Sequence, residues 1–129
     1  MFIKKICLTV FLAATAVNIS YASIAGNYHC TGYDPFEKAS YQEKLQVKKT
    51  GETFSFSSDF GDGETAKGTG IYDESNHMFA AACVDSTPGK PKQTGFAIAS
   101  VKEDGSFDVT WSYLNKTKTA RSQCKKVTA

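Results

Sequence analysis

The two histidines are the residues of this chain best suited to metal or acid–base chemistry. His29 directly precedes Cys30, in a segment whose polar and apolar residues alternate as in a β-strand. Adjacent side chains of a strand point to opposite faces, so His29 and Cys30 cannot share a metal ion or form a nucleophile–base pair. We therefore predict no metal site and interpret His29 and His77 as ordinary surface or strand-end residues.

The sequence signatures of common enzymes are also missing. The chain contains no Gly-x-Ser-x-Gly, no His-Glu-x-x-His and no phosphate-binding glycine loop. We predict that the protein has no catalytic residue and no cofactor and is not an enzyme. An enzyme with an unfamiliar site stays as a third alternative beside the two binding functions described below.

The segment 59–64 carries three carboxylates in six residues, Asp59, Asp62 and Glu64. A calcium loop needs several more oxygen ligands and a later bidentate glutamate, which this segment lacks. We predict a glycine-rich hairpin here. Gly68 and Gly70 are likewise interpreted as points of close backbone approach, although a ligand contact is the alternative.

The first 22 residues have the order of a secretory signal peptide. Two lysines precede an apolar run over residues 6–17, which is too short to span a bilayer, and Ser20 and Ala22 supply the small residues before a cleavage site. We predict a signal peptide over 1–22, a single domain over 23–129, and export to the periplasm or the medium.

Charge and hydropathy remove two further classes of function. The two lysines of the leader are its only charged residues, so its removal leaves as many basic as acidic residues. A neutral domain lacks the positive field that binding to nucleic-acid phosphates requires. No later apolar stretch is long enough to cross a membrane as a helix. We expect a monomer that binds no nucleic acid and has no membrane anchor.

Beyond the leader, the hydrophobic residues repeat with a period of two. Tyr41, Glu43, Leu45 and Val47 alternate with polar neighbours, as expected for a half-buried strand. Clusters of glycine, proline, aspartate and asparagine separate such runs. The resulting candidate strands are 24–31, 41–49, 52–60, 65–72, 77–84, 93–101, 106–114 and 117–127.

Short connections between these strands predict an all-β, eight-stranded antiparallel up-and-down meander. We expect it to close into a barrel, because closure removes exposed sheet edges, although a sandwich has the same strand count. Closure places the first strand beside the last, and therefore Cys30 beside Cys124. We predict a Cys30–Cys124 disulfide, with Cys83 left as a reduced core residue.

The start of the domain resembles a known group of barrels. Gly26-Asn27-Tyr28, followed by an eight-stranded meander, resembles the opening of lipocalin-like and avidin-like (calycin-type) barrels, whose first strand often carries Gly-x-Trp. The layout through Trp111 to Cys124 also resembles small exported barrels of bacteria. Tyrosine replaces the family's tryptophan at position 28, and the second lipocalin signature, Thr-Asp-Tyr, is absent. The resemblance implies the architecture but no ligand.

The inward faces of the strands are one candidate binding region. Strands 77–84 and 93–101 supply small residues (Ala80, Ala82, Gly95, Ala97 and Ala99) opposite bulky aromatic ones. A barrel of this size is either filled by side chains or holds one small ligand. We favour a filled core, because large-against-small packing also gives a dense interior. If the lumen is hollow, its candidate ligand-contacting residues are Tyr28, Phe54, Phe56, Phe107, Trp111 and Tyr113.

A basic outer wall is the other candidate region. The last predicted strand is locally basic and lies two strands from the lysines of the second strand. The candidate docking residues are Lys44, Lys48, Lys116, Lys118, Arg121 and Lys125. Such a wall would attract an acidic protein or an anionic glycan, and a merely solvated, edge-protecting face is the alternative.

These observations predict an exported, non-enzymatic binding module. We favour docking of an acidic protein or another anionic partner by the basic wall, as in small periplasmic hydrolase inhibitors built on similar one-disulfide barrels. The alternative is a lipocalin-like carrier of a small apolar ligand in the lumen.

Overall fold

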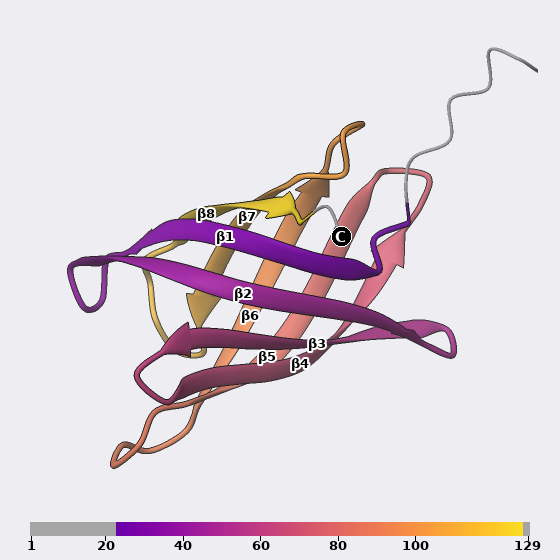
Figure 1. Cartoon of the computed structure of the whole chain (residues 1–129). Coiled ribbons are helices and arrows are strands. Elements are labelled where there is room, and N and C mark those ends of the chain that lie inside the picture. The colour runs from indigo at the N-terminus through magenta and orange to yellow at the C-terminus, as the bar shows by residue number, and fades with distance from the viewer. Residues whose placement is uncertain (1–22, 128–129) are drawn as a thin grey trace, which may run out of the picture.

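The computed structural model describes residues 23–127, which form one closed antiparallel β-barrel (Figure 1). The predicted signal peptide lies outside the described residues. The eight strands follow one another around the barrel in chain order: β1 (Gly26–Asp34), β2 (Ala39–Thr50), β3 (Thr53–Gly61), β4 (Glu64–Asp73), β5 (Met78–Ser86), β6 (Gln93–Val101), β7 (Phe107–Tyr113) and β8 (Ala120–Lys126). The predicted fold class, an all-β up-and-down meander barrel, is confirmed.

The period-two pattern decides which side chains enter the barrel. In β2, Tyr41, Glu43, Leu45 and Val47 are buried or half-buried, whereas the residues between them are exposed. The same alternation recurs in β1, β4 and β6. Burial of the inward apolar side chains is the main favourable contribution to folding. One face of every strand therefore forms the interior.

Glycines act at the turns and at close approaches between strands. Asp62 and Gly63 both have positive φ values, 53° and 80°, as a two-residue hairpin turn requires. The glycine-rich hairpin predicted over 59–64 is therefore confirmed. A Cβ atom on Gly70 would lie only 2.3 Å from the Phe79 ring, so this glycine marks a close approach, as predicted.

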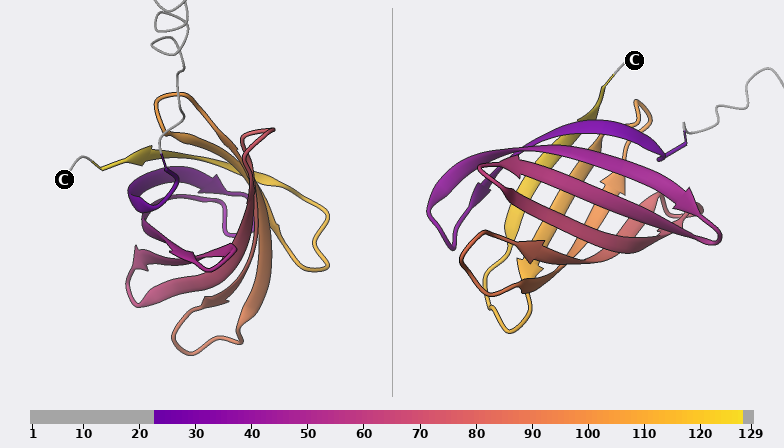
Figure 2. Two further views of the ribbon diagram at one scale, coloured as in Figure 1. Left: turned by 90° about the vertical axis from the view of Figure 1, so that its right-hand side faces the viewer. Right: turned by 60° about the horizontal axis from the view of Figure 1, so that its bottom comes forward.

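The barrel closes through β1, which pairs with both β2 and β8. Figure 2 shows the sheet curving round until β8 lies beside β1. Cys30 and Cys124 are directly paired across this seam and form the predicted disulfide, with 4.0 Å between their Cα atoms. Both half-cystines are buried inside the barrel, and Cys83 is the free cysteine of the described chain. A disulfide indicates an oxidising, extracytoplasmic compartment.

One end of the barrel is closed by packed side chains, and we call it the closed end. The Tyr28 ring stacks on the Phe107 ring with 4.5 Å between centroids, and the Tyr28 hydroxyl donates a 2.7 Å hydrogen bond to the Ile24 carbonyl. Val47 and Phe54 complete this buried layer. The core of the protein therefore lies at the closed end rather than along the whole barrel.

Both ends of the described chain lie at this closed end. The Lys126 ammonium donates a 2.7 Å hydrogen bond to the Ser23 carbonyl, which joins the two ends across the seam. The hairpins that connect β1 to β2, β3 to β4, β5 to β6 and β7 to β8 all lie at the opposite end, on the left in Figure 1. We call that end the mouth.

Two details of the predicted strands were wrong. The last strand begins at Ala120 rather than at residue 117, so Lys116 and Lys118 lie in the loop before β8. Ala80 and Ala82 point outward and are exposed, although the sequence analysis placed them in the interior. Their inward neighbours on β5 are Phe79, Ala81, Cys83 and Asp85.

Candidate functional site

The barrel encloses a cavity of about 300 Å³ that opens at the mouth. Its deep wall is apolar and includes Leu45, Phe56, Ala81 and Val109, with Phe107 at the closed end. At the mouth, the exposed residue Glu37 belongs to its rim. The filled core that the sequence analysis favoured is therefore wrong, because the inward residues of β6 are too small to fill the space.

The predicted ligand-lumen residues divide between two layers. Phe56, Phe107, Trp111 and Tyr113 line the cavity. Tyr28 and Phe54 lie in the buried layer of the closed end and do not line it.

Aromatic side chains lie along one side of the mouth, and we call this group the aromatic collar: Phe36, Tyr41, Phe60, Trp111 and Tyr113. Consecutive rings of the collar contact one another. The centroid separations are 5.8 Å for Phe60 and Tyr41, 6.1 Å for Tyr41 and Trp111, 5.4 Å for Trp111 and Tyr113, and 5.4 Å for Tyr113 and Phe36. Rings at these separations and tilts pack through edge-to-face contacts. The collar is therefore a connected group supplied by β2, β3, β7 and the β1–β2 turn.

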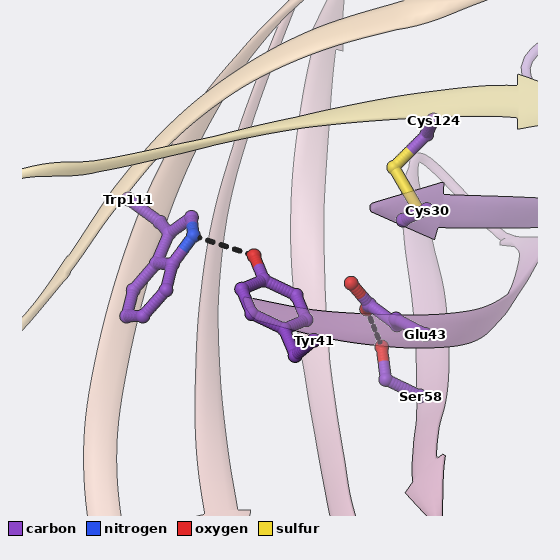
Figure 3. The surroundings of a disulfide bond; sticks show 6 residues. All are labelled: Cys30, Tyr41, Glu43, Ser58, Trp111 and Cys124. Carbon is purple, nitrogen blue, oxygen red and sulfur yellow. Dashed lines mark hydrogen bonds between the residues drawn. A yellow bond between two sulfur atoms is a disulfide. The ribbon is translucent and has the colours of Figure 1, made fainter. Parts of the chain in front are cut away.

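Local structure holds the collar in place. The Trp111 Nε1 donates a 2.9 Å hydrogen bond to the Tyr41 hydroxyl, across the barrel from β7 to β2 (Figure 3). Tyr41 lies over Gly32, where a Cβ atom would be 2.6 Å from the Tyr41 Oη. The Asp34 carboxylate accepts a 2.8 Å hydrogen bond from the Phe36 backbone N–H, which fixes the turn that carries Phe36.

An acidic group lies beside the collar, and the sequence analysis did not identify it. Five carboxylates from four parts of the chain line the cavity: Asp34, Glu37, Glu43, Glu64 and Asp85. Among the described residues, no lysine, arginine or histidine lines it. The sequence did contain a signal, because Glu43 shares the apolar phase of its strand with Tyr41 and Leu45.

Asp85 is the most deeply buried member of this group, with 8% of its surface exposed. Its Oδ2 accepts a 2.7 Å hydrogen bond from the Tyr113 hydroxyl. Burial, followed by this hydrogen bond, raises the pKa of Tyr113 far above its usual value. Its Oδ1 is buried and receives no hydrogen bond in the structure. The Glu64 carboxyl lies within hydrogen-bonding reach of Asp85, so this oxygen gains a donor only when Glu64 is protonated.

The carboxyl groups beside Asp85 respond to burial and to each other. Burial, followed by the charge of Asp85, raises the pKa of Glu64 from its ordinary 4.5 to about 7. Burial also raises the pKa of Glu43, against the lowering effect of a short hydrogen bond that the Ser58 hydroxyl donates to it (Figure 3). Like charges that are forced together favour proton uptake. The mouth is therefore lined by acidic groups whose negative charge falls as Glu64 takes up a proton below a pH of about 7.

The basic residues predicted to form one wall are distributed over two places on the outside. Lys44 on β2 and Lys125 on β8 both pair with His29 on β1, so three nitrogen-bearing side chains form one row across the seam. Lys48 lies nearer the closed end on β2, and Arg121 lies nearer the mouth on β8. Lys116 and Lys118 lie near the mouth, in the loop between β7 and β8.

An apolar strip lies on the outer faces of β5 and β6 and includes Ile71 of β4. Ile71, Phe96 and Ile98 are 65%, 50% and 53% exposed. Ile71 pairs with Ala80, which in turn pairs with Ile98, so these side chains form a continuous strip. The sequence analysis missed this strip because it assigned the alanines of β5 to the interior.

Within residues 23–127, no three histidine, cysteine or acidic side chains are placed to hold a metal ion. The same part of the chain has no helix of the length and hydropathy needed to span a membrane.

The fold and the site together define a closed eight-stranded barrel with an internal cavity open at one end. No protein-family model, curated protein or solved structure matches this chain.

Proposed function

We propose that the protein is an exported, non-enzymatic binding protein that holds one small ligand in the barrel cavity. The observation that carries this proposal is a cavity of about 300 Å³ that is sealed at the closed end and open at the mouth. Export is supported by the leader-like order of residues 1–22 and by the Cys30–Cys124 disulfide.

The cavity has the properties of a preformed ligand site. Its deep wall offers apolar surface, and its mouth offers a few polar groups that can orient a ligand, as is usual for small-molecule sites. Each Å² of apolar ligand surface removed from water contributes about 25 cal/mol. The collar is already held by hydrogen bonds and ring contacts, so little ordering is left for the binding step.

Two adjacent alanines of β5 provide a test of the site. Ala81 lines the cavity and Ala82 points outward, so Ala81→Leu narrows the cavity while Ala82→Leu adds the same side chain to the outside. The probe is N-phenyl-1-naphthylamine, a neutral dye that becomes fluorescent in apolar surroundings. We expect the wild type and Ala82→Leu to bind it and Ala81→Leu to lose binding.

Equal binding by both variants, or no binding by the wild type, would overturn the lumen proposal. Thermal unfolding establishes that each variant is folded. Ala97→Leu repeats the test from β6, because Ala97 pairs with Ala81 and also lines the cavity.

A second candidate function is docking of an acidic protein or an anionic glycan on the outer wall. The observation that favours it is the row of Lys44, His29 and Lys125 across the seam. Heparin can serve as the anionic probe. The test variant carries both Lys44→Glu and Lys125→Glu. The control variant carries Lys67→Glu and Lys92→Glu, which make the same charge change elsewhere on the protein. We expect the test variant to elute from heparin at lower salt than the control. Identical elution would remove this candidate.

A further inference from the structure

We propose that the ligand of the cavity is an organic cation, with an ammonium group held at Asp85 beside the aromatic collar and an apolar body directed toward the closed end. This inference rests on the proposed function and specifies the chemical class of the ligand. Three independent features of the site support it: an unsatisfied buried oxygen, the sign of the charge and the arrangement of the rings.

The unsatisfied oxygen is Asp85 Oδ1. Asp85 is 8% exposed and lines the cavity, its Oδ2 is occupied by the Tyr113 hydroxyl, and Oδ1 has no hydrogen bond. The neighbouring Glu64 can supply a hydrogen to it only when Glu64 itself is protonated. A ligand N–H group could donate a charge-assisted hydrogen bond to this oxygen, and a methylated ammonium could contact it as an ion pair without a hydrogen bond.

The sign of the charge excludes anionic ligands and favours cationic ones. The five carboxylates of the mouth have no basic residue beside them in the cavity lining of the described chain. Glu37 alone reaches a cation, Lys90, at 3.8 Å on the exposed rim. Like charges that line a cleft with low-dielectric walls concentrate their field inside it. An anion would be repelled at the mouth before it reached the apolar wall.

The rings distinguish an organic cation from a metal ion. No three of the acidic side chains in the described chain converge on one point, as a metal ion would require. The collar instead presents Tyr41, Trp111 and Tyr113 beside the same carboxylates. Aromatic faces attract ammonium groups, tryptophan most strongly, and desolvation strengthens that attraction.

A proton competes with the ligand for this site. Burial and the charge of Asp85 raise the pKa of Glu64 to about 7, so at lower pH a proton already neutralises part of the group. The titratable groups that face Glu64 and Asp85 from the surrounding strands and turn are Asp34, Glu37, Glu43, Cys83 and Tyr113. We therefore expect cation affinity to fall as the pH is lowered through about 7.

The test compares two ligands of the same shape and different charge. Phenyltrimethylammonium carries a permanent positive charge, and tert-butylbenzene is its neutral isostere. Trp111 is the single tryptophan of the chain and lines the cavity, so its fluorescence reports binding directly. We expect the cation to bind roughly ten-fold more tightly than the isostere. We expect Asp85→Asn to remove this preference and Glu74→Gln, in the exposed turn after β4 at the closed end, to keep it.

The outcomes separate this inference from the proposed function. If both ligands bind equally well, the cation inference fails while the lumen function stands. If neither ligand nor the neutral dye binds, the proposed function itself fails. A preference that survives Asp85→Asn unchanged would also overturn the assignment of Asp85.

A second measurement needs no substitution, because Cys83 lines the cavity and is free. Methanethiosulfonate reagents convert a thiol to a mixed disulfide and release methanesulfinate, and they exist with a trimethylammonium or a sulfonate group. Peptide mapping identifies Cys83 as the modified residue. Each modification rate is divided by the rate of the same reagent with a small free thiol, which removes the intrinsic reactivity of the reagent. We expect the normalised rate to be higher for the cationic reagent. An equal or faster rate for the anionic reagent would contradict a negative mouth.

Discussion

Tyr113 on β7 donates its phenolic hydrogen to Asp85 on β5, across the strand that lies between them, with 2.7 Å separating Oη and Oδ2. Gly95 lies on the intervening strand β6, where a Cβ atom would be 3.0 Å from the Cys83 sulfur and in ordinary contact, at 3.6 Å, with the Tyr113 ring. One oxygen of a buried carboxylate is thus satisfied by the protein and the other is left facing the cavity.

The Tyr113–Asp85 hydrogen bond should contribute measurably to stability. Tyr113→Phe removes the donor and leaves both Asp85 oxygens without a partner. We expect a loss of about 1–3 kcal/mol in the free energy of unfolding, as for other hydrogen bonds to charged groups. Urea unfolding provides the measurement. Tyr33→Phe is the control, because Tyr33 is exposed on the outside of β1, and an equal loss in both variants would contradict the prediction.

Glu64 should make stability depend on pH between its ordinary pKa of 4.5 and its raised pKa of about 7. In that window the folded protein holds a proton that the unfolded chain has lost. The free energy of unfolding should therefore fall as the pH rises from 4.5 to 7 and level off above it.

Glu64→Gln should reduce this slope and stabilise the protein above pH 7, since its amide can donate to the unpaired oxygen of Asp85. Denaturant unfolding at a series of pH values measures the slope. Glu74→Gln removes a carboxylate from an exposed turn and should leave it unchanged. Equal slopes for wild type and Glu64→Gln would show that Glu64 is not the titrating group.

The disulfide should resist reduction while the barrel is folded. Cys30 is 0% exposed and Cys124, in the cavity wall, is 2% exposed, so the bridge offers a thiol reagent almost no surface while the barrel is folded. We expect dithiothreitol to reduce it only with denaturant present, as read by alkylation and mass spectrometry. Replacing both cysteines by alanine should cost roughly 4–5 kcal/mol on the chain-entropy estimate for a loop of this length. Rapid reduction of the native protein would contradict the buried position.

Gly32 should be necessary for the position of the collar. Gly32→Ala places a methyl group where Tyr41 now lies, so Tyr41 must move and its hydrogen bond with Trp111 is lost. We expect a loss of about 1–3 kcal/mol in stability, as for other overpacked positions, together with a shift in Trp111 fluorescence. Thr31→Ala changes the outward neighbour and should leave the fluorescence as in the wild type.

The sequence predicted the barrel because nearly every strand alternates cleanly and every connection is short. The prediction of which β5 residues point inward was wrong. Residues 80–84 are small and apolar at every position, so no alternation of polar and apolar residues distinguishes the two faces of this strand. The flanking Phe79 and Asp85 fix the phase only once pairing with β4 and β6 is known. The start of β8 was placed too early because residues 116–119 alternate lysine and threonine without an apolar face.

The site was less predictable than the fold. Glu43, Glu64 and Asp85 are far apart in the chain, and the pairing of β2 through β5 around the barrel brings them to one mouth. Whether the interior is hollow depends on the summed volumes of inward side chains from all strands, which no local pattern contains. The aromatic residues, in contrast, were identifiable from the sequence, because they occupy the inward phase of otherwise unambiguous strands.

The contact between Lys126 and Ser23 determines how this barrel can be attached to a support. Because both ends of the described chain meet behind the closed end, a tether at either end leaves the mouth pointing away from the surface. An immobilised layer of the protein would therefore present uniformly oriented open cavities to the solution, whichever end carries the tag. Capture of ligands from complex extracts can use either fusion without obstructing the collar.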